Sequence, residues 1–331
     1  MVNRDINFSL WLDFVERDFL KNEFSALIEK GIINGATSNP SIFASAITNS
    51  PAYKKQLTQL EGKTAKEKYE ALAIEDIRTA AQALRDAYDE GNDGYISIEV
   101  DPFLSNDTEG TIAEGKRLFA AIGEPNVMIK IPATKAGYRA MTELLATGIS
   151  VNATLIFSPD QAKQCLKAMK VGIDQFEADG GTRVEAVISV FVSRFDRHLD
   201  DDLACEGIDV SRTGIYNAAK IYNLIENNHT PSIRTLFAST GVKGDGLEAD
   251  YYIRELFAPH SVNTAPLATI EAYISKKETQ PKLPMEDSEI NGYFTKLSDC
   301  GFDMDEVYEK LLKDGLEAFE IAFKEMLDTL K

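Results

Sequence analysis

A lysine stands in the middle of the short apolar run Val127-Met-Ile-Lys-Ile-Pro132. A run of this length that ends at a proline is typical of a buried strand, and alternation places Lys130 on the opposite face from Ile129 and Ile131. Burial disfavours the charged ammonium group and lowers the pKa of the amine, and a neutral amine is a nucleophile toward carbonyl carbon. Alternatively, Lys130 lies at a strand end with its ammonium group in water. The run by itself leaves both interpretations open.

Polar residues stand at the ends of the other apolar runs and just beyond them. A lysine, acids and neutral hydrogen-bonding groups together suit imine chemistry, because the lysine attacks a carbonyl, the acids move protons, and amides and hydroxyls hold a polyol. Each residue alone has a local explanation, since Asn and Thr often cap turns and helices. The members of this set besides Lys130 are Asp13, Thr37, Asn39, Glu99, Asn152, Thr154, Ser189, Arg194, Ser239 and Lys243.

The elements that position these residues are short apolar strands, each followed by a helical pattern. An eightfold alternation of this kind predicts a (β/α)8 barrel, a TIM barrel, ahead of an open doubly wound sheet. In such a barrel the carboxyl ends of the strands converge on one mouth, which favours a common site for the polar set. The expected strands lie at 6–15, 32–41 (running into a polar turn), 95–102, 127–131, 150–157, 184–192, 235–239 and 260–264. Helices are expected up to about 30 and over 51–90, 108–122, 135–147, 158–177, 194–203, 214–226, 246–256 and 266–277.

The C-terminal part of the chain departs from this alternation. From about residue 278 to 298, Pro281, Pro284 and clustered acids predict an irregular surface insertion. Residues 304–330 have the periodicity of one long amphipathic helix, which we expect to pack across the barrel. We expect the whole chain, residues 1–331, to form a single barrel domain with this extra terminal helix.

Composition limits the partners of the protein. The chain has 331 residues, 44% of them hydrophobic, and a formal net charge of −18. This charge argues against nucleic acid or an anionic membrane as a partner, and an anionic substrate then needs a locally basic pocket. No apolar run approaches membrane length, the N-terminus has no signal-peptide pattern, and the three cysteines lack metal-ligand spacing. We expect a cytoplasmic protein, and the sequence leaves open whether it is a monomer or a homodimer.

Four segments resemble motifs of the transaldolase family, in the order that the family has them. Gly35-Ala-Thr-Ser-Asn-Pro40 is similar to the motif that ends the second core strand, and Val127-Met-Ile-Lys-Ile-Pro-Ala-Thr134 to the segment of the Schiff-base lysine. Val151-Asn-Ala-Thr-Leu-Ile-Phe-Ser158 and Ile188-Ser-Val-Phe-Val-Ser-Arg194 resemble later strands. The resemblance spans nearly the whole chain and implies a class I aldolase-like barrel.

The resemblance also implies a reaction and roles for residues. The family transfers a dihydroxyacetone unit from sedoheptulose 7-phosphate or fructose 6-phosphate to glyceraldehyde 3-phosphate or erythrose 4-phosphate, in the non-oxidative pentose phosphate pathway, without a metal or organic cofactor. Lys130 then forms the imine, Glu99 and a water transfer protons, and Asp13 is the acid/base at the hydroxyl beside the cleaved bond. The resemblance further implies that Thr154 positions a water and that Phe191 lines the pocket. It implies that Arg194 binds the phosphate. The dihydroxyacetone portion would be held by Asn39, Asn152 and Ser189. The polar strand ends add Thr37 and Ser239 to the expected substrate-binding residues.

One departure from the family pattern concerns the phosphate. Many members carry Ser-Phe-Arg after the seventh strand, whereas this chain has Ser239-Thr-Gly-Val-Lys243. Lys243 can replace the missing arginine only as a point charge, without bidentate geometry. Two other functions stay open at this stage: a Schiff-base fructose-6-phosphate aldolase-like lyase, and a barrel that binds sugar phosphates without catalysis.

Overall fold

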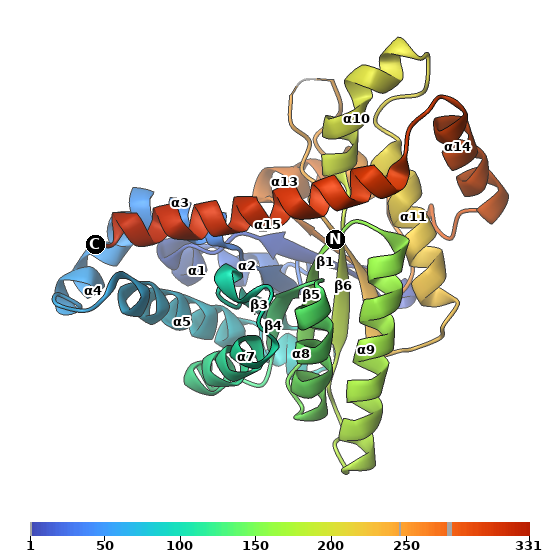
Figure 1. The fold of residues 1–331 in the computed structure, drawn as a ribbon. Helices are drawn as coiled ribbons and strands as arrows, with labels where there is room; N and C mark the ends of the chain where they lie inside the picture. Colours follow the sequence, from blue (N-terminus) through green and yellow to red (C-terminus); the bar gives the residue numbers. More distant parts are fainter. Residues whose placement is uncertain (1, 245, 277–279) are drawn as a thin grey trace.

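The computed structural model describes residues 2–244, 246–276 and 280–331, and within them eight parallel strands close into one barrel in the order β1 to β8 (Figure 1). The prediction of a (β/α)8 barrel is therefore confirmed. The strands are β1 (Phe8–Asp13), β2 (Gly35–Thr37), β3 (Tyr95–Glu99), β4 (Val127–Pro132), β5 (Val151–Ile156), β6 (Ala186–Phe191), β7 (Ile233–Ala238) and β8 (Ser261–Ala265).

Side-chain alternation divides each strand between two hydrophobic layers. In β4, Ile129 and Ile131 belong to the layer between the strands and the surrounding helices. Met128, one residue out of phase, belongs with Trp11 and Tyr95 to a second cluster, which begins inside the barrel and continues to the C-terminal helices. Lys130 shares the inward phase of Met128, as the period of two requires.

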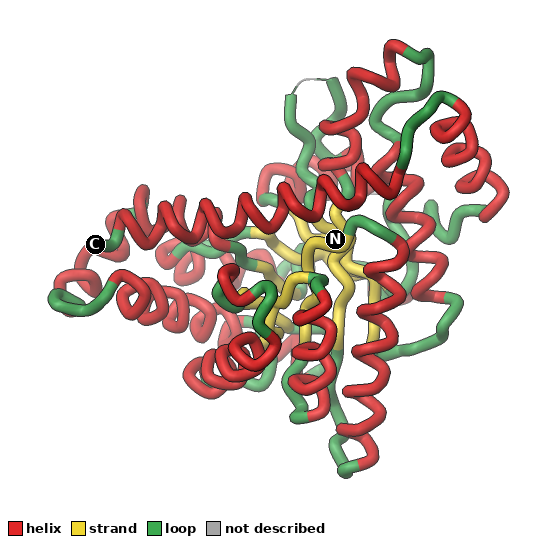
Figure 2. Tube along the Cα trace, viewed as in Figure 1, coloured by secondary structure: helices red, strands yellow, loops and turns green. Residues whose placement is uncertain are grey.

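Helices enclose the barrel and alternate with its strands (Figures 1 and 2). They are α1 (Arg17–Asn22), α2 (Phe24–Glu29), α3 (Pro40–Asn49), α4 (Lys54–Gln59), α5 (Ala65–Ala83), α6 (Arg85–Asp89), α7 (Thr108–Ile122), α8 (Lys135–Ala146), α9 (Pro159–Ala178), α10 (Ser193–Cys205), α11 (Thr213–Glu226), α12 (Tyr251–Glu255) and α13 (Leu267–Lys276). Three short 3-10 helices, η1 (Arg4–Ile6), η2 (Pro51–Tyr53) and η3 (Pro102–Leu104), complete the barrel part of the described chain.

Several helix predictions were wrong in detail. The polar turn expected after the second strand continues as α3, which Asn39 caps by accepting a hydrogen bond from the Ile42 amide, with Pro40 at its first position. The helix expected over 51–90 divides into η2, α4, α5 and α6, because local turns interrupt the apolar periodicity. The helix expected over 246–256 is reduced to α12, since residues 246–250 form bends and turns.

The C-terminal region contains one correction and one confirmation. The irregular insertion expected over 278–298 is wrong for most of its length: residues 280–286 lack regular structure, but α14 (Asp287–Asp299) is a helix that buries Ile290 and Leu297, while 278 and 279 lie outside the described residues. The prolines precede this helix and do not interrupt it. The expected terminal helix is α15 (Met304–Thr329), which crosses the molecule in Figures 1 and 2 and packs on α3, α5, η3 and β5.

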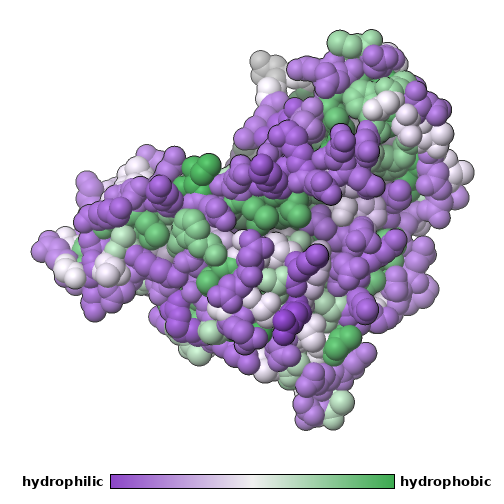
Figure 3. Space-filling model, in the orientation of Figure 1, coloured by the Kyte–Doolittle hydropathy of each residue, from purple (hydrophilic) through white to green (hydrophobic). Residues whose placement is uncertain are grey.

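The surface matches the acidic composition. Figure 3 shows a mostly hydrophilic face, with small hydrophobic areas beside α15. Within the described residues, no helix has the length and apolar character that crossing a membrane demands.

Candidate active site

A cavity of about 210 Å³ lies at the carboxyl ends of the strands, and we call it the lysine cavity. It contains every residue of the expected set except Glu99 and Lys243, so the convergence predicted from the sequence is present in the fold. Its lining residues are Asp13, Thr37, Asn39, Ser41, Lys130, Asn152, Thr154, Ser189, Phe191, Arg194, Ala238, Ser239, Thr264 and Phe319.

Lys130 reaches this cavity from inside the barrel. The residue is 6% exposed, and its Nζ donates a hydrogen bond to the carbonyl oxygen of Ser38 at 3.2 Å. Nζ also lies 3.7 Å from Glu99 Oε2 and 5.8 Å from the centre of the Phe319 ring. The alternative in which the ammonium group extends into water is therefore wrong, and the amine faces an enclosed space where a carbonyl carbon could reach it.

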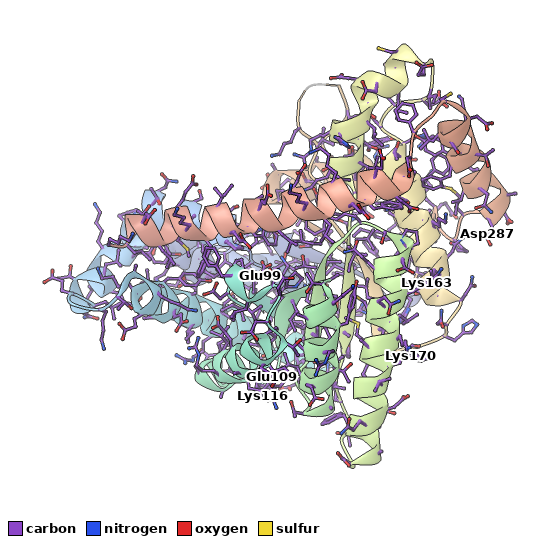
Figure 4. All side chains as sticks on the ribbon, viewed as in Figure 1. Glu99, Glu109, Lys116, Lys163, Lys170 and Asp287 are labelled. Carbon is purple, nitrogen blue, oxygen red and sulfur yellow. The ribbon has the colours of Figure 1, made fainter. Side chains whose placement is uncertain are left out.

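Glu99 stands beside Lys130 because β3 and β4 pair these two positions in register. Burial raises the pKa of Glu99 to about 7, while the positive charge of Lys130 opposes the rise and the nearby Asp13 adds to it. Its Oε2 has no hydrogen-bond partner in the described part of the chain. Glu99 is labelled in Figure 4 between the barrel and α15. A carboxyl group that titrates near neutrality can both accept and return a proton under ordinary conditions.

Asp13, at the end of β1, is the second acid of the cavity. Its Oδ1 accepts a hydrogen bond from Thr37 Oγ1 at 2.7 Å, and the Thr37 and Thr264 hydroxyls are also 2.7 Å apart. Burial raises the pKa of Asp13, against the lowering effects of Lys130 and the Thr37 hydrogen bond. Thr37 thus orients the carboxyl group, and the second carboxyl oxygen remains for a substrate hydroxyl.

Two amides of the cavity are held in place by hydrogen bonds. Asn152 donates through Nδ2 to Ser97 Oγ at 3.0 Å and accepts through Oδ1 from Ser189 Oγ at 2.6 Å. Asn39 uses its Oδ1 to cap α3, which leaves Nδ2 as a donor. Asn39 can therefore cap α3 through its oxygen and still donate a hydrogen bond to a ligand through Nδ2.

Thr154 lies beside an irregularity in β5. The pairing of β5 with β6 shifts register between Ala153 and Ile156, and Leu155 has a φ of 59°. The shift turns Leu155 into the inner cluster, against simple alternation. Thr154 lines the cavity with a buried Oγ1 that has no hydrogen-bond partner among the described residues. Such a hydroxyl is free to bind a ligand or a reacting water.

A second cavity of about 470 Å³ adjoins the first and shares Asp13, Arg194, Ser239 and Thr264 with it. We call it the cationic cavity, because three cations, Arg194, Arg197 and Lys243, line it against two acids, Asp13 and Asp314. None of these three cations forms an ion pair within the described residues. The guanidinium group of Arg194 lies 5.1 Å from the centre of the Phe191 ring, and burial, with a smaller contribution from Arg197, lowers the pKa of Arg194.

This arrangement makes a locally basic place in an acidic protein. Three unpaired cations favour an anionic ligand, and two guanidinium groups can contact phosphate oxygens by paired hydrogen bonds. No three His, Cys, Asp or Glu side chains in the described ranges are grouped to hold a metal ion.

Several residues of the two cavities were not in the sequence-derived set. Arg197 follows Arg194 by three residues in α10, a spacing that places both on one helix face and could have been noticed. Thr264 ends β8 and satisfies the same rule of strand ends that identified Thr37. Phe319 carries no such signal, because only the path of α15 brings it to the mouth.

Known proteins resemble this chain over nearly its full length. The sequence profile described as transaldolase/fructose-6-phosphate aldolase matches residues 10–330. The chain belongs to the transaldolase/fructose-6-phosphate aldolase family. A transaldolase of Campylobacter jejuni subsp. jejuni serotype O:23/36 (strain 81-176) is 50% identical over 98% of this chain and 99% of its own length. A transaldolase of Helicobacter pylori (strain Shi470) is 44% identical over 97% of this chain and 99% of its own. The family match covers both cavities, from Asp13 to Phe319.

Proposed function

We propose that this member of the family is a transaldolase. It transfers a dihydroxyacetone unit from a ketose phosphate, sedoheptulose 7-phosphate or fructose 6-phosphate, to glyceraldehyde 3-phosphate or erythrose 4-phosphate. The observation that carries the proposal is the enclosed amine of Lys130, with Nζ 3.7 Å from Glu99 and a cationic cavity next to it. A nucleophilic amine, two acids and an anion site are what a Schiff-base reaction of sugar phosphates requires.

In the first half of the reaction, the neutral amine of Lys130 attacks the ketose carbonyl and water leaves to form a protonated imine. Glu99, whose pKa is about 7, exchanges the protons of this step through a water that Thr154 positions. Asp13 then takes the proton of the hydroxyl next to the bond that breaks. The electrons of that bond move to the imine nitrogen, which leaves an enamine on Lys130 and an aldehyde free to depart.

In the second half, the enamine attacks the acceptor aldehyde, Asp13 returns the proton to the new hydroxyl, and water releases the product from Lys130. Asn39, Asn152 and Ser189 hold the hydroxyls of the dihydroxyacetone portion, and Phe191 forms a wall of the pocket. Arg194 binds the phosphate, with Arg197 and Lys243 beside it and the hydroxyl of Ser239 between the two cavities. The unpaired cations offset the repulsion that a net charge of −18 exerts on an anionic substrate.

The same proposal includes the setting of the enzyme. We infer a single domain over residues 1–331 that works in the cytoplasm, in the non-oxidative pentose phosphate pathway, as a monomer or a homodimer. Sugar phosphates are its partners, and nucleic acid and membranes are not. The relatives named transaldolase and the acidic composition support this setting.

The test traps the imine. Wild-type enzyme and Lys130→Arg are incubated with fructose 6-phosphate and borohydride, and peptide mass spectrometry locates the reduced adduct. We expect an adduct on Lys130 in the wild type and none in Lys130→Arg, whose guanidinium group stays protonated. An adduct elsewhere, or none, contradicts the proposal. A coupled assay with erythrose 4-phosphate as acceptor then separates transfer from release: comparable rates with and without acceptor identify a lyase.

A further inference from the structure

Phe319 is the aromatic residue that faces the reactive amine from outside the barrel. It lies in the C-terminal helix α15, is 7% exposed and lines the lysine cavity. Its ring centre is 5.8 Å from Lys130 Nζ, within the range of a cation–π contact. No polar atom of this side chain could donate or accept a proton.

Close packing of α15 on the barrel fixes the position of this ring. Gly315 stands one turn before Phe319, and a Cβ at Gly315 would lie 3.0 Å from Leu155 and 3.2 Å from Arg194 Nη1. Glycine therefore lets the helix backbone approach the strand ends closely. One turn after Phe319, the Phe323 ring packs edge-on against Tyr69 at 5.3 Å between ring centres. Contacts on both sides hold Phe319 over the cavity as part of the packed fold.

The enamine on Lys130 can undergo transfer or release, and release depends on whether a proton can reach the enamine carbon. In transfer, the enamine carbon bonds to the acceptor aldehyde and the aldehyde oxygen takes a proton. In release, the enamine carbon takes a proton, water adds to the resulting imine, the C–N bond breaks, and free dihydroxyacetone leaves with the amine restored. Protonation at carbon commits the intermediate to release, so a wall without proton donors favours transfer.

We infer that Phe319 is the residue that shields the enamine carbon from solvent protons and thereby sets the ratio of transfer to release. The inference rests on the proposed Schiff-base function. Apart from Phe191 and Ala238, the cavity side chains on and beside the strand ends are polar, and Phe319 closes the side that α15 covers. Removal of the ring opens that side to water while Lys130, Glu99 and Asp13 keep their places on the strands.

The experiment uses free dihydroxyacetone in deuterated water. Its imine with Lys130 can lose a carbon-bound proton to give the enamine and then take up deuterium, so the exchange rate by NMR reports proton access to that carbon. We expect Phe319→Ala to raise the exchange per active site, counted by borohydride labelling, by at least about tenfold. The rate of dihydroxyacetone release from fructose 6-phosphate, relative to transfer to erythrose 4-phosphate, should rise with it. Phe319→Leu, which keeps an apolar cover, should lie between Ala and wild type.

Ile321→Ala is the matched control, because Ile321 lies on the same helix and is 57% exposed. This variant should leave unchanged both the deuterium exchange per active site and the rate of release relative to transfer. If exchange and transfer fall together in Phe319→Ala, or if the ratio does not change, the inference is wrong and the ring only stabilises α15. If Phe319→Ala does not fold in thermal unfolding, Phe319→Leu decides by the same criterion. Absence of a borohydride adduct on wild-type Lys130 would instead refute the proposed function itself.

Discussion

The two ends of the barrel each contain a buried ion pair, and the pairs differ in how completely they are hydrogen-bonded. At the amino ends of the strands, Arg234 donates to Asp93 and, at 3.3 Å, to Ser9, while Trp11 donates to the other oxygen of Asp93 at 2.8 Å. At the carboxyl ends, Lys130 Nζ is 3.7 Å from Glu99 Oε2, and that oxygen has no hydrogen-bond partner in the described ranges.

The difference separates an ion pair that stabilises the fold from one that can take part in proton transfer. Arg234 and Asp93 are 3% and 7% exposed, and the bonds to each carboxyl oxygen keep Asp93 fixed within the base of the barrel. Glu99 is as deeply buried, but its incomplete pairing leaves burial as the dominant effect and raises its pKa to about 7. A carboxylate whose two oxygens both accept hydrogen bonds keeps its orientation and its charge. A carboxylate with an oxygen that accepts no hydrogen bond can exchange a proton.

The comparison predicts that Lys130→Met abolishes activity without loss of stability. We expect turnover to fall by about 10⁴-fold or more, because the covalent route is removed. The free energy of unfolding in urea should be unchanged or higher, because Glu99, whose pKa is about 7 even beside Lys130, takes up a proton when the lysine is removed and no unpaired charge stays buried. Substantial residual turnover in a preparation free of contaminating enzyme would move the nucleophile away from Lys130.

At the opposite end, Asp93→Ala should act on stability. Removal of Asp93 leaves the buried Arg234 with only the more distant Glu185, 4.0 Å away, as a counter-ion, and loss of the close partner of a buried pair costs about 3–5 kcal/mol of unfolding free energy. Urea unfolding measures the loss, and borohydride labelling of Lys130 in the folded fraction checks that the mouth is intact. A stable Asp93→Ala with reduced labelling would reverse the roles assigned to the two pairs.

Glu99→Gln tests the reactive side of the comparison through pH. We expect wild-type kcat/KM to rise through an apparent pKa near 7 as Glu99 becomes a carboxylate, and Glu99→Gln to lose this inflection and about 10²–10³-fold in rate. Because the folded state holds the proton of Glu99 more tightly, its contribution to stability is full below the ordinary pKa of 4.5 and is lost as the pH rises to about 7. An unaltered pH profile in Glu99→Gln would assign the inflection to another group.

Arg194→Ala extends the comparison to the edge of the barrel mouth, where Arg194 forms no ion pair with any residue that the structure describes. Loss of a charge-assisted contact worth about 1.5–3 kcal/mol should raise KM for fructose 6-phosphate by roughly 10- to 100-fold. Turnover of unphosphorylated fructose serves as the control and should change little. Equal effects on both donors would indicate that Arg194 supports α15 packing rather than phosphate binding.

Asp314→Asn should have the smallest effect. Asp314 lies in α15, lines the cationic cavity and is bonded to Lys310 at 2.9 Å. Removal of an exposed negative charge near the phosphate should lower KM for phosphorylated donors by roughly twofold at low salt. Repetition at high ionic strength should abolish the difference, and a salt-independent change would point to a packing effect.

The sequence by itself determined the barrel and most of its mouth. Apolar strands of period two, each followed by a helical pattern, leave few arrangements other than a closed parallel barrel. The same period places Lys130 and Ile129 on opposite faces of their strand, and closure of the barrel then turns Lys130 inward and brings Glu99 beside it. The alternation and the succession of strands and helices depend on neighbours in the chain and on backbone geometry, so local patterns are sufficient to predict them.

Local signals also existed where the predictions were wrong. Asn39 and Pro40 form a helix start that indicates α3, and Arg197 stands one turn from Arg194. The prolines before α14 predict an irregular segment, but they precede a helix with an apolar face. These features follow from the sequence once the start of each helix is considered.

Only the tertiary structure decided which distant residues complete the site. Phe319 approaches Lys130 because α15 packs across the barrel mouth, and Gly315 permits that approach. Arg234 meets Asp93 because β7 and the segment before β3 enter the same barrel interior. Such contacts depend on how whole helices and strands pack and on how deeply they bury each side chain. Packing and burial change pKa values and hydrogen bonding, but no periodic pattern in the sequence indicates them.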